Sequence, residues 1–281
     1  MEEININPLE TTYLYGLDKY FNDFTKLYDL NFLPRVLLLT GKKGSGKFTL
    51  CVHLLNYIFN RSNYDFENRK ILNKTNVNTK LKNNNFSNII YLNNYEKKVK
   101  IEDIRSLKSV LLKSTLNNKP RFIILDDVET FNHNSLNALL KIIEEPNSKN
   151  FFILINNKQT HILETIRSRC METSLFLKEK ERITIIDKLT ELNSIETILN
   201  YKKLDITPGD FIRYNNICVI NNIKLNTNYI IKLNSILSFY KKTKELDFIK
   251  LSIFFTEQYF QELIIKSCLL YTSPSPRDGL L

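Results

Sequence analysis

The sequence predicts an α/β fold in which a parallel-sheet domain comes first and helical domains follow. Two observations predict the sheet: short apolar runs alternate with helical apolar spacing in the first part of the chain, and a glycine-rich loop joins one such run to a helix. Alternating buried strands and amphipathic helices are typical of a parallel sheet covered on both faces. A third observation predicts the helical part, because helical spacing dominates over residues 178–199 and 229–269.

Length and hydropathy limit the class of protein. The 281 residues fit two or three soluble domains. The longest apolar runs, such as 36–39 and 151–155, are far shorter than the roughly 18 residues that span a bilayer. The first residues show no basic stretch followed by an apolar one, so no secretory signal is predicted. We therefore expect no membrane partner and a cytoplasmic location.

Cysteine spacing and charge say more about partners. The four cysteines are scattered without any C-x-x-C pair, so we expect reduced thiols and no zinc. The formal net charge of +10 suits a polyanionic partner such as DNA, since lysine and arginine displace its condensed counterions. The chain is also rich in Asn, Ile, Tyr and Phe, which an AT-rich genome encodes, so codon bias is an alternative source of the lysines.

The first predicted unit is a strand, a loop and a helix. The strand covers residues 35–40, and Cys51, Leu54, Leu55 and Ile58 then recur at the spacing of one helical face. The segment 61–88 is polar, asparagine-rich and without clear periodicity, so it is predicted to be a solvated loop and is assigned no function.

Further strands and helices complete the sheet domain. Strands are predicted at 89–92, 122–125 and 151–155. One helix is predicted to start near Lys100, and a second covers 136–143. Proline follows each of these helical segments and ends it. We expect this domain to occupy residues 1–171.

The glycine-rich loop carries the clearest chemical signal. Residues 41–47 match the first seven positions of a P-loop, in the required place between a strand and a helix. Backbone N–H groups of such a loop form an anion nest, the helix dipole adds to it, and Lys47 can reach the terminal phosphates. A glycine turn with a chance lysine is the alternative. The residues expected to contact a nucleotide are Gly41, Lys42, Lys43, Gly44, Ser45, Gly46, Lys47, Phe48 and Thr49.

One position departs from the motif. A P-loop has Ser or Thr directly after the lysine, and its hydroxyl binds Mg²⁺. This chain has Phe48 there, and Thr49 is turned by about 100° around the helix, away from the metal. Binding of ATP can therefore survive while Mg²⁺-assisted hydrolysis is impaired.

Two carboxylates follow the strand at 122–125. Asp126 at the strand end can hold Mg²⁺, and Asp127 can orient an attacking water. An acidic loop that caps the next helix is the alternative, because acids are common before helices. Together with a P-loop, the pair indicates a nucleotide site.

Two later segments carry a resemblance to a known family. Residues 137–146, NALLKIIEEP, resemble the NALLK-x-LEEP segment of clamp-loader subunits, and residues 165–170, TIRSRC, resemble their SRC motif. The likeness covers about 34–170, and residues 14–16 with 33–34 resemble the family's approach to the P-loop. The chain thus resembles clamp-loader subunits of the AAA+ ATPase class.

The resemblance implies a domain order and residue roles. A helical lid domain is expected at 172–222 and a partial, truncated helical collar domain at 223–270, with a non-native tail at 271–281 that breaks from the earlier composition. Lys47 matches the Walker A lysine, Asp126 the Walker B aspartate, and Asp127 stands at the place of the catalytic glutamate. Asn157 matches the sensor-1 position. Arg169 matches the SRC arginine, an arginine finger that acts in trans on ATP of a neighbouring subunit.

The departures from the family pattern narrow the resemblance to the bacterial delta-prime type. These departures are Phe48, Asp127 in place of glutamate, an offset Arg213 near the sensor-2 position, and no cysteine in 61–88, where many relatives carry a zinc module. Such a subunit resembles a stator with little ATPase of its own. The implied partners are the other clamp-loader subunits of a hetero-oligomeric ring, the sliding clamp and primer-template DNA.

Two alternatives stay open. The first is an ATP-hydrolysing motor subunit of the gamma/tau or replication factor C kind. The second is another AAA+ protein that acts on DNA without loading a clamp. Turnover of ATP by the isolated chain favours the first alternative, and absence of a clamp among its partners favours the second.

Overall fold

A computed structural model describes residues 7–72, 88–94, 98–113 and 119–271. The chain forms two compact units. The first unit contains the described residues up to Lys188 together with Thr207–Asp210, and the second contains Leu189–Ile206 and the described residues from Phe211 onward.

The first unit is built on a five-stranded parallel sheet with the strand order β4-β5-β6-β1-β7. The register pairs Thr40 with Asn156 and Leu125 with Leu154, so the carboxyl ends of three strands share one edge. The strands in chain order are β1 (Val36–Thr40), β4 (Ile89–Asn93), β5 (Arg121–Asp126), β6 (Asn150–Asn156) and β7 (Met171–Ser174).

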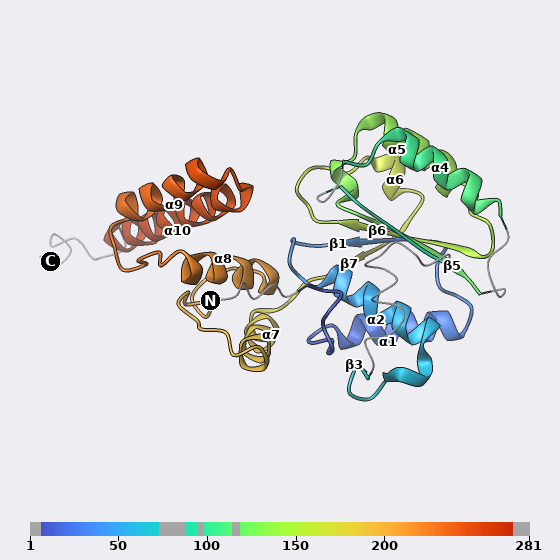
Figure 1. The fold of residues 1–281 in the computed structure, drawn as a ribbon, viewed down its shortest axis with the longest axis horizontal. Coiled ribbons are helices and arrows are strands. Elements are labelled where there is room, and N and C mark those ends of the chain that lie inside the picture. Colours follow the sequence, from blue (N-terminus) through green and yellow to red (C-terminus); the bar gives the residue numbers. More distant parts are fainter. Residues whose placement is uncertain (1–6, 73–87, 95–97, 114–118, 272–281) are drawn as a thin grey trace, which may run out of the picture. The chain divides into compact units, whose positions relative to one another are not determined.

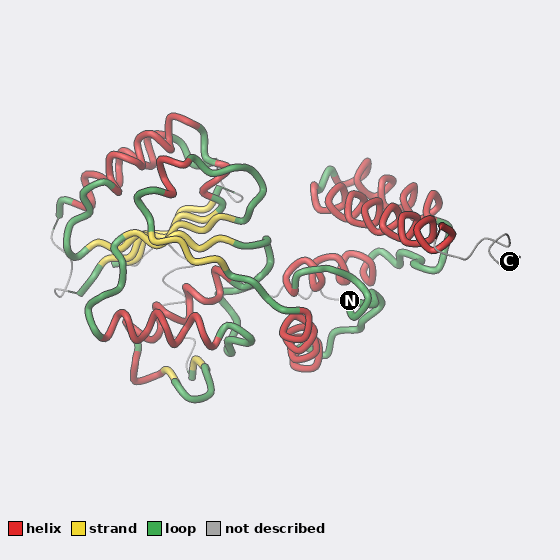
Figure 2. Tube along the Cα trace, turned by 180° about the vertical axis from the view of Figure 1, so that it is seen from behind, coloured by secondary structure: helices red, strands yellow, loops and turns green. Residues whose placement is uncertain are grey.

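Helices cover both faces of this sheet (Figures 1 and 2). Strand residues alternate between two core clusters: Leu37 and Leu39 pack with α1 and α2, whereas Leu38 packs with α4, α5 and α6. The strands are buried on both sides, which explains their continuous apolar runs. The helices are α1 (Asp18–Asp29) and α2 (Lys47–Phe59) on one face, and α4 (Ile101–Leu111), α5 (His133–Ile143) and α6 (Glu164–Arg167) on the other. The α/β parallel-sheet prediction is confirmed.

Part of the predicted solvated loop at 61–88 is ordered and packed. It holds a 3-10 turn, η1 (Arg61–Asn63), and an antiparallel hairpin of β2 (Tyr64–Asp65) and β3 (Lys70–Ile71), whereas 73–87 lie outside the described residues. Tyr64 and Ile71 are buried, and the Tyr64 ring lies 5.4 Å from that of Phe21. The loop prediction was wrong for the hairpin, because two-residue strands are too short to show periodicity.

The sheet also extends past the expected domain end at 171. Strand β7 begins there and pairs in parallel with β1, and the compact unit continues into α7 (Glu179–Leu192). A second 3-10 turn, η3 (Val128–Thr130), follows β5. Strand β7 reads Met-Glu-Thr-Ser and is largely exposed at the sheet edge. It therefore lacks the apolar run that identified the other strands.

The second unit is helical, with α8 (Pro208–Ile220) leading into it and α9 (Tyr229–Thr243) and α10 (Leu246–Tyr271) following. The single helical segment predicted at 229–269 is two helices, because Lys244 is left-handed and ends α9. Tyr229 of α9 stacks on Tyr259 of α10, with ring centroids 4.3 Å apart. The lid and collar boundaries stay predictions, and 272–281 of the predicted tail lie outside the described residues. No helix in the described part of the chain is long and apolar enough to cross a membrane.

A buried hydrogen bond between the hairpin and α2 predicts a stability effect. His53 Nδ1 lies 2.9 Å from the Tyr64 hydroxyl, and burial lowers the pKa of His53 to about 3, so its ring is neutral at pH 7. Since His53 Nε2 has no partner among the described residues, Tyr64→Phe leaves both ring nitrogens unpaired. We expect a loss of about 1–3 kcal/mol in the free energy of unfolding, measured by urea denaturation.

Tyr20→Phe is the control for that measurement, because the Tyr20 hydroxyl bonds Ser174 O at an exposed position. It should cost much less. Equal losses in the two variants would contradict the role given to the His53–Tyr64 bond.

Candidate functional site

The predicted P-loop lies at the carboxyl edge of the sheet, between β1 and α2. Gly44 and Gly46 have φ angles of 77° and 88°, which side chains rarely adopt, and Gly46 is the N-cap of α2. This left-handed backbone turns the loop into the helix N-terminus, as an anion nest requires. Gly41, Ser45 and Lys47 are buried, Lys42 is exposed, and Lys43, Phe48 and Thr49 are half-buried.

The Lys47 side chain is folded into its own loop. Its ammonium Nζ donates to Gly41 O at 2.8 Å and Lys42 O at 2.7 Å, and lies 3.3 Å from Ser45 Oγ. Lys47 is only 3% exposed. Burial lowers its pKa from 10.5 to about 8, against the opposing charges of Asp126, Glu129 and Asp127. The loop carbonyls thus accept the hydrogen bonds that the Lys47 ammonium would otherwise donate to a phosphate.

The residue that directly follows the P-loop lysine is an aromatic one, Phe48. Phe48 stacks on Tyr91 with ring centroids 4.6 Å apart, and the Tyr91 hydroxyl donates to Asp126 Oδ2 at 3.4 Å. Ser or Thr would offer a hydroxyl ligand where Phe48 offers a hydrocarbon face. In the described part of the chain, no group of three or more His, Cys, Asp or Glu residues could hold a metal. Of the two protein ligands that the motif supplies to Mg²⁺, the carboxylate of Asp126 is present and the hydroxyl is replaced by Phe48.

The two aspartates after β5 are held by neighbouring donors. Asp126 Oδ1 accepts from Asn157 Nδ2 at 3.1 Å, and burial raises the pKa of Asp126, with the charge of Asp127 adding to the effect. Asp127 Oδ1 accepts from Asn157 and Gln159, both at 2.7 Å, and its Oδ2 pairs with Lys43 Nζ at 3.0 Å. Three side chains, Lys43, Asn157 and Gln159, therefore bind the Asp127 carboxylate.

The structure brings Asp126, Asp127 and Asn157 together, as predicted, and adds residues that the sequence reasoning missed. Glu129 Oε1 accepts from the backbone N–H groups of Asn157 at 3.0 Å and Gln159 at 3.3 Å. Burial raises the pKa of Glu129. The acidic run after β5 contained Glu129, but spacing alone could not show that it binds the loop after β6.

A segment distant in sequence lies against the P-loop. Gly209 N donates to Gly44 O at 3.0 Å, and a Cβ added at Gly209 would lie 2.7 Å from Gly44 Cα. Backbones approach this closely only where side chains are absent. Arg213, four residues on, pairs instead with Asp247 at 3.7 Å.

Arg169 is separate from these groups and lies just after α6. Its Nε and Nη2 donate to Glu144 Oε1 at 3.1 and 2.7 Å, and its Nη1 donates to Thr165 O at 2.9 Å. The side chain is 36% exposed. Among the described residues, none of the P-loop or aspartate groups bonds to it.

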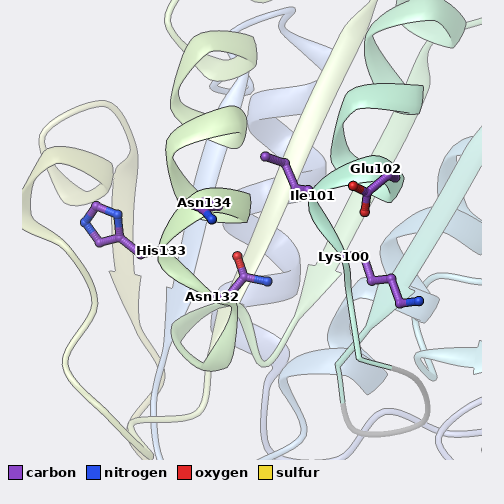
Figure 3. A pocket seen from close by; sticks show the side chains of 6 residues that line it. All are labelled: Lys100, Ile101, Glu102, Asn132, His133 and Asn134. Carbon is purple, nitrogen blue, oxygen red and sulfur yellow. The ribbon is translucent and has the colours of Figure 1, made fainter.

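A surface pocket lies elsewhere, where the N-termini of α4 and α5 meet (Figure 3). Asn132 caps α5 by accepting from Ser135 N at 2.8 Å, and the His133 side chain points away from α4. None of the predicted site residues lines this pocket. Its lining is Lys100, Ile101, Glu102, Asn132, His133 and Asn134.

Comparison with known proteins gives a family match. The model of the family described as "DNA polymerase III, delta subunit" matches residues 16–192. The DNA polymerase III delta-prime subunit of Buchnera aphidicola subsp. Baizongia pistaciae is 30% identical over 95 residues, covering 34% of this chain and 28% of that protein. The delta-prime subunit of Buchnera aphidicola subsp. Schizaphis graminum is 27% identical over 206 residues, covering 61% and 63%. Each match spans less than two thirds of the relative.

Gamma-type relatives and solved structures are also similar. The DNA polymerase III gamma subunit of Buchnera aphidicola subsp. Schizaphis graminum is 33% identical over 86 residues, covering 31% of this chain and 24% of that protein. A gamma-subunit-related protein of Thermotoga maritima has a TM-score of 0.43 at 18% identity, covering 84% and 76% of the two chains. The RuvB branch migration motor of Thermotoga maritima has a TM-score of 0.47 at 17% identity, covering 83% and 73%.

The buried lysine of the P-loop generates a prediction. Lys47→Met removes a charge that burial disfavours, so the free energy of unfolding at pH 7 should rise by at most about 3 kcal/mol. The folded-state pKa lies below the unfolded one. The wild-type chain therefore regains stability as pH rises from about 8 to 10.5, and the advantage of Lys47→Met should shrink over that range.

Urea denaturation at pH 7 and pH 10 measures both effects. Lys42→Met is the matched control, since Lys42 is an exposed lysine of the same loop, and it should change little. A Lys47→Met chain less stable than wild type at pH 7 would show that the bonds to Gly41 O and Lys42 O outweigh the burial of the charge.

Proposed function

The chain belongs to the family described as DNA polymerase III, delta subunit, and from this premise we propose that it is a clamp-loader subunit of the delta-prime type. In this proposal it helps a ring of loader subunits to place a sliding clamp on primed DNA, in an ATP-dependent reaction. In the ring it acts as a structural subunit that supplies one arginine to a neighbouring ATP site and has little ATPase activity of its own.

The replacement of the metal-binding hydroxyl by Phe48 carries this proposal. Phe48 and Tyr91 stack beside Asp126, so the site offers one carboxylate and an aromatic surface where a hydrolysing site needs a hydroxyl and a carboxylate. Asp127, at the place of a catalytic glutamate, is occupied by three donor side chains. These contacts support a P-loop subunit that does not turn over ATP, whether or not its loop binds a nucleotide.

The arginine after α6 supplies the second part of the proposal. Arg169 is 36% exposed and contacts no group of its own chain's P-loop among the described residues. In trans, its guanidinium would stabilise the charge that develops on the phosphates of ATP held by a neighbour, as arginine fingers do. The active site would then be shared by two subunits.

The partners follow from this assignment. They are the other clamp-loader subunits, the sliding clamp and primer-template DNA, and the site of action is the cytoplasm. The net charge of +10 is compatible with a DNA partner. ATP is the nucleotide expected at the shared site.

A motor subunit of the gamma/tau kind is the second candidate. The complete run of residues 41–47 favours it, as does the 33% identity to a gamma subunit over 86 residues. A motor subunit would hydrolyse ATP in isolation, and a stator would not.

We expect the isolated chain to show no Mg²⁺-dependent turnover of ATP, because Phe48 supplies no hydroxyl ligand to the metal. Any binding of labelled ATP should be unchanged by EDTA. Equilibrium binding and single-turnover hydrolysis, each with and without Mg²⁺, measure this. Robust Mg²⁺-dependent hydrolysis by the lone chain would support the motor candidate and overturn the stator.

In the reconstituted loader, Arg169→Ala should lower the turnover rate at the neighbouring ATP site by a factor of about 10³, since that is the lower end of the effect of an arginine finger. Single-turnover ATPase with clamp and primed DNA present measures it. Arg167→Ala is the matched control, because Arg167 is a nearby surface arginine whose ion pairs go to Glu164 and Glu172. An unchanged turnover rate in Arg169→Ala would contradict the proposal that Arg169 acts as an arginine finger.

A further inference from the structure

We infer that Glu144 is a positioning residue for Arg169: its carboxylate holds one edge of the guanidinium so that the other end can meet a phosphate. This inference rests on the proposed function of Arg169 and adds a second residue to the same shared site. Glu144 lies in the segment that resembles the family's NALLK-x-LEEP motif. It had no expected role in the sequence interpretation.

The hydrogen bonds of Arg169 define the orientation. A guanidinium has five N–H groups. Three bonds from Nε, Nη2 and Nη1 go to Glu144 Oε1 and Thr165 O. One N–H remains on each terminal nitrogen with no partner among the described residues. These two N–H groups are left to bind a phosphate.

The backbones that carry the two residues are fixed by one core. Glu144 is the C-cap of α5, and its N–H donates to Leu140 O at 3.1 Å. Arg169 follows α6, and its N–H donates to Ile166 O at 3.1 Å. Ile166 is fully buried in the same cluster as Leu136, Leu139 and Ile143 of α5. The ion pair therefore joins two helices that pack into the same core cluster.

The neighbouring arginine uses the same three donors but differs in the charge of its acceptors. Arg167 binds two carboxylates, with Nε and Nη2 on Glu172 and Nη1 on Glu164. Two anions overcompensate its charge, so a phosphate would be repelled. Arg169 binds a single carboxylate, and its third bond goes to a neutral carbonyl. Both arginines keep one N–H on each terminal nitrogen, but of the two only Arg169 is held by a single carboxylate, so its positive charge is not overcompensated.

The pair is better suited to orientation than to stability. The two side chains are 36% and 48% exposed, and surface ion pairs contribute little to folding. A free arginine must lose its rotamer freedom when it meets a phosphate, whereas a planar group already held by a carboxylate loses less. The effect of Glu144 should therefore appear in the rate of the chemical step.

The experiment uses the reconstituted loader with clamp and primed DNA, and measures kcat and KM for ATP at the shared site. We expect Glu144→Ala to lower kcat about 10-fold with little change in KM, at the lower end of the range for groups that orient a functional residue. Glu144→Gln keeps an acceptor oxygen and should retain part of the activity. Glu145→Gln is the matched control, because Glu145 is the exposed next residue and has no bond among the described residues.

A double-mutant cycle connects the effect to Arg169. With Arg169→Ala in place, Glu144→Ala should have no further effect on kcat, because the group that it orients is gone. Equal losses in both backgrounds, or faster turnover in Glu144→Ala, would overturn the inference. Faster turnover would mean that the carboxylate competes with the phosphate for the arginine.

The two levels of the proposal fail in different ways. If Arg169→Ala lowers the rate and Glu144→Ala leaves it unchanged, the finger stands and the positioning role is wrong. If Arg169→Ala has no effect, the finger itself is wrong. Thermal unfolding of each variant confirms that the chain is folded, and Glu144→Gln serves for the cycle if Glu144→Ala does not assemble.

Discussion

The parallel pairing of β1, β5 and β6 is the constraint on which the rest of the site depends. Its register sets Thr40 opposite Asn156 and Leu125 opposite Leu154, so each strand delivers its next residues to the same edge. The P-loop, the aspartates and Asn157 meet there although they are far apart in sequence. The bonds from Asn157 Nδ2 to both aspartates follow directly from this register.

Each buried charge at this edge has at least one partner within the chain, although Glu129 Oε2 has none among the described residues. Lys47, Asp127 and Glu129 are each at most 5% exposed, which is costly for charged groups unless they have partners. Loop carbonyls accept hydrogen bonds from Lys47 Nζ, and Lys43 forms an ion pair with Asp127. Backbone N–H groups donate to Glu129 Oε1. A P-loop that satisfies its own charges in this way differs from one that relies on a phosphate to do so.

The sequence predicted what local pattern determines and missed what tertiary contact determines. Apolar runs located β1, β4, β5 and β6, and the glycine spacing located the P-loop. Strand β7 was missed because an edge strand needs no apolar run. The sequence showed that Phe48 replaces the usual hydroxyl residue of the P-loop. It could not show that Phe48 stacks on Tyr91, because residue spacing does not tell how close α2 and β4 lie in space. For the same reason Arg169 could be found by resemblance, whereas its partner Glu144 could not.

The close approach of Gly44 and Gly209 limits how this protein can change through evolution. A methyl group at Gly209 would press on the backbone of Gly44, and one at Gly44 would lie 2.5 Å from Thr207 Oγ1. Replacement of either glycine by a larger residue would displace the segment of the chain that faces it. The two glycines are therefore expected to be retained or replaced together during evolution, even though 164 intervening positions separate them.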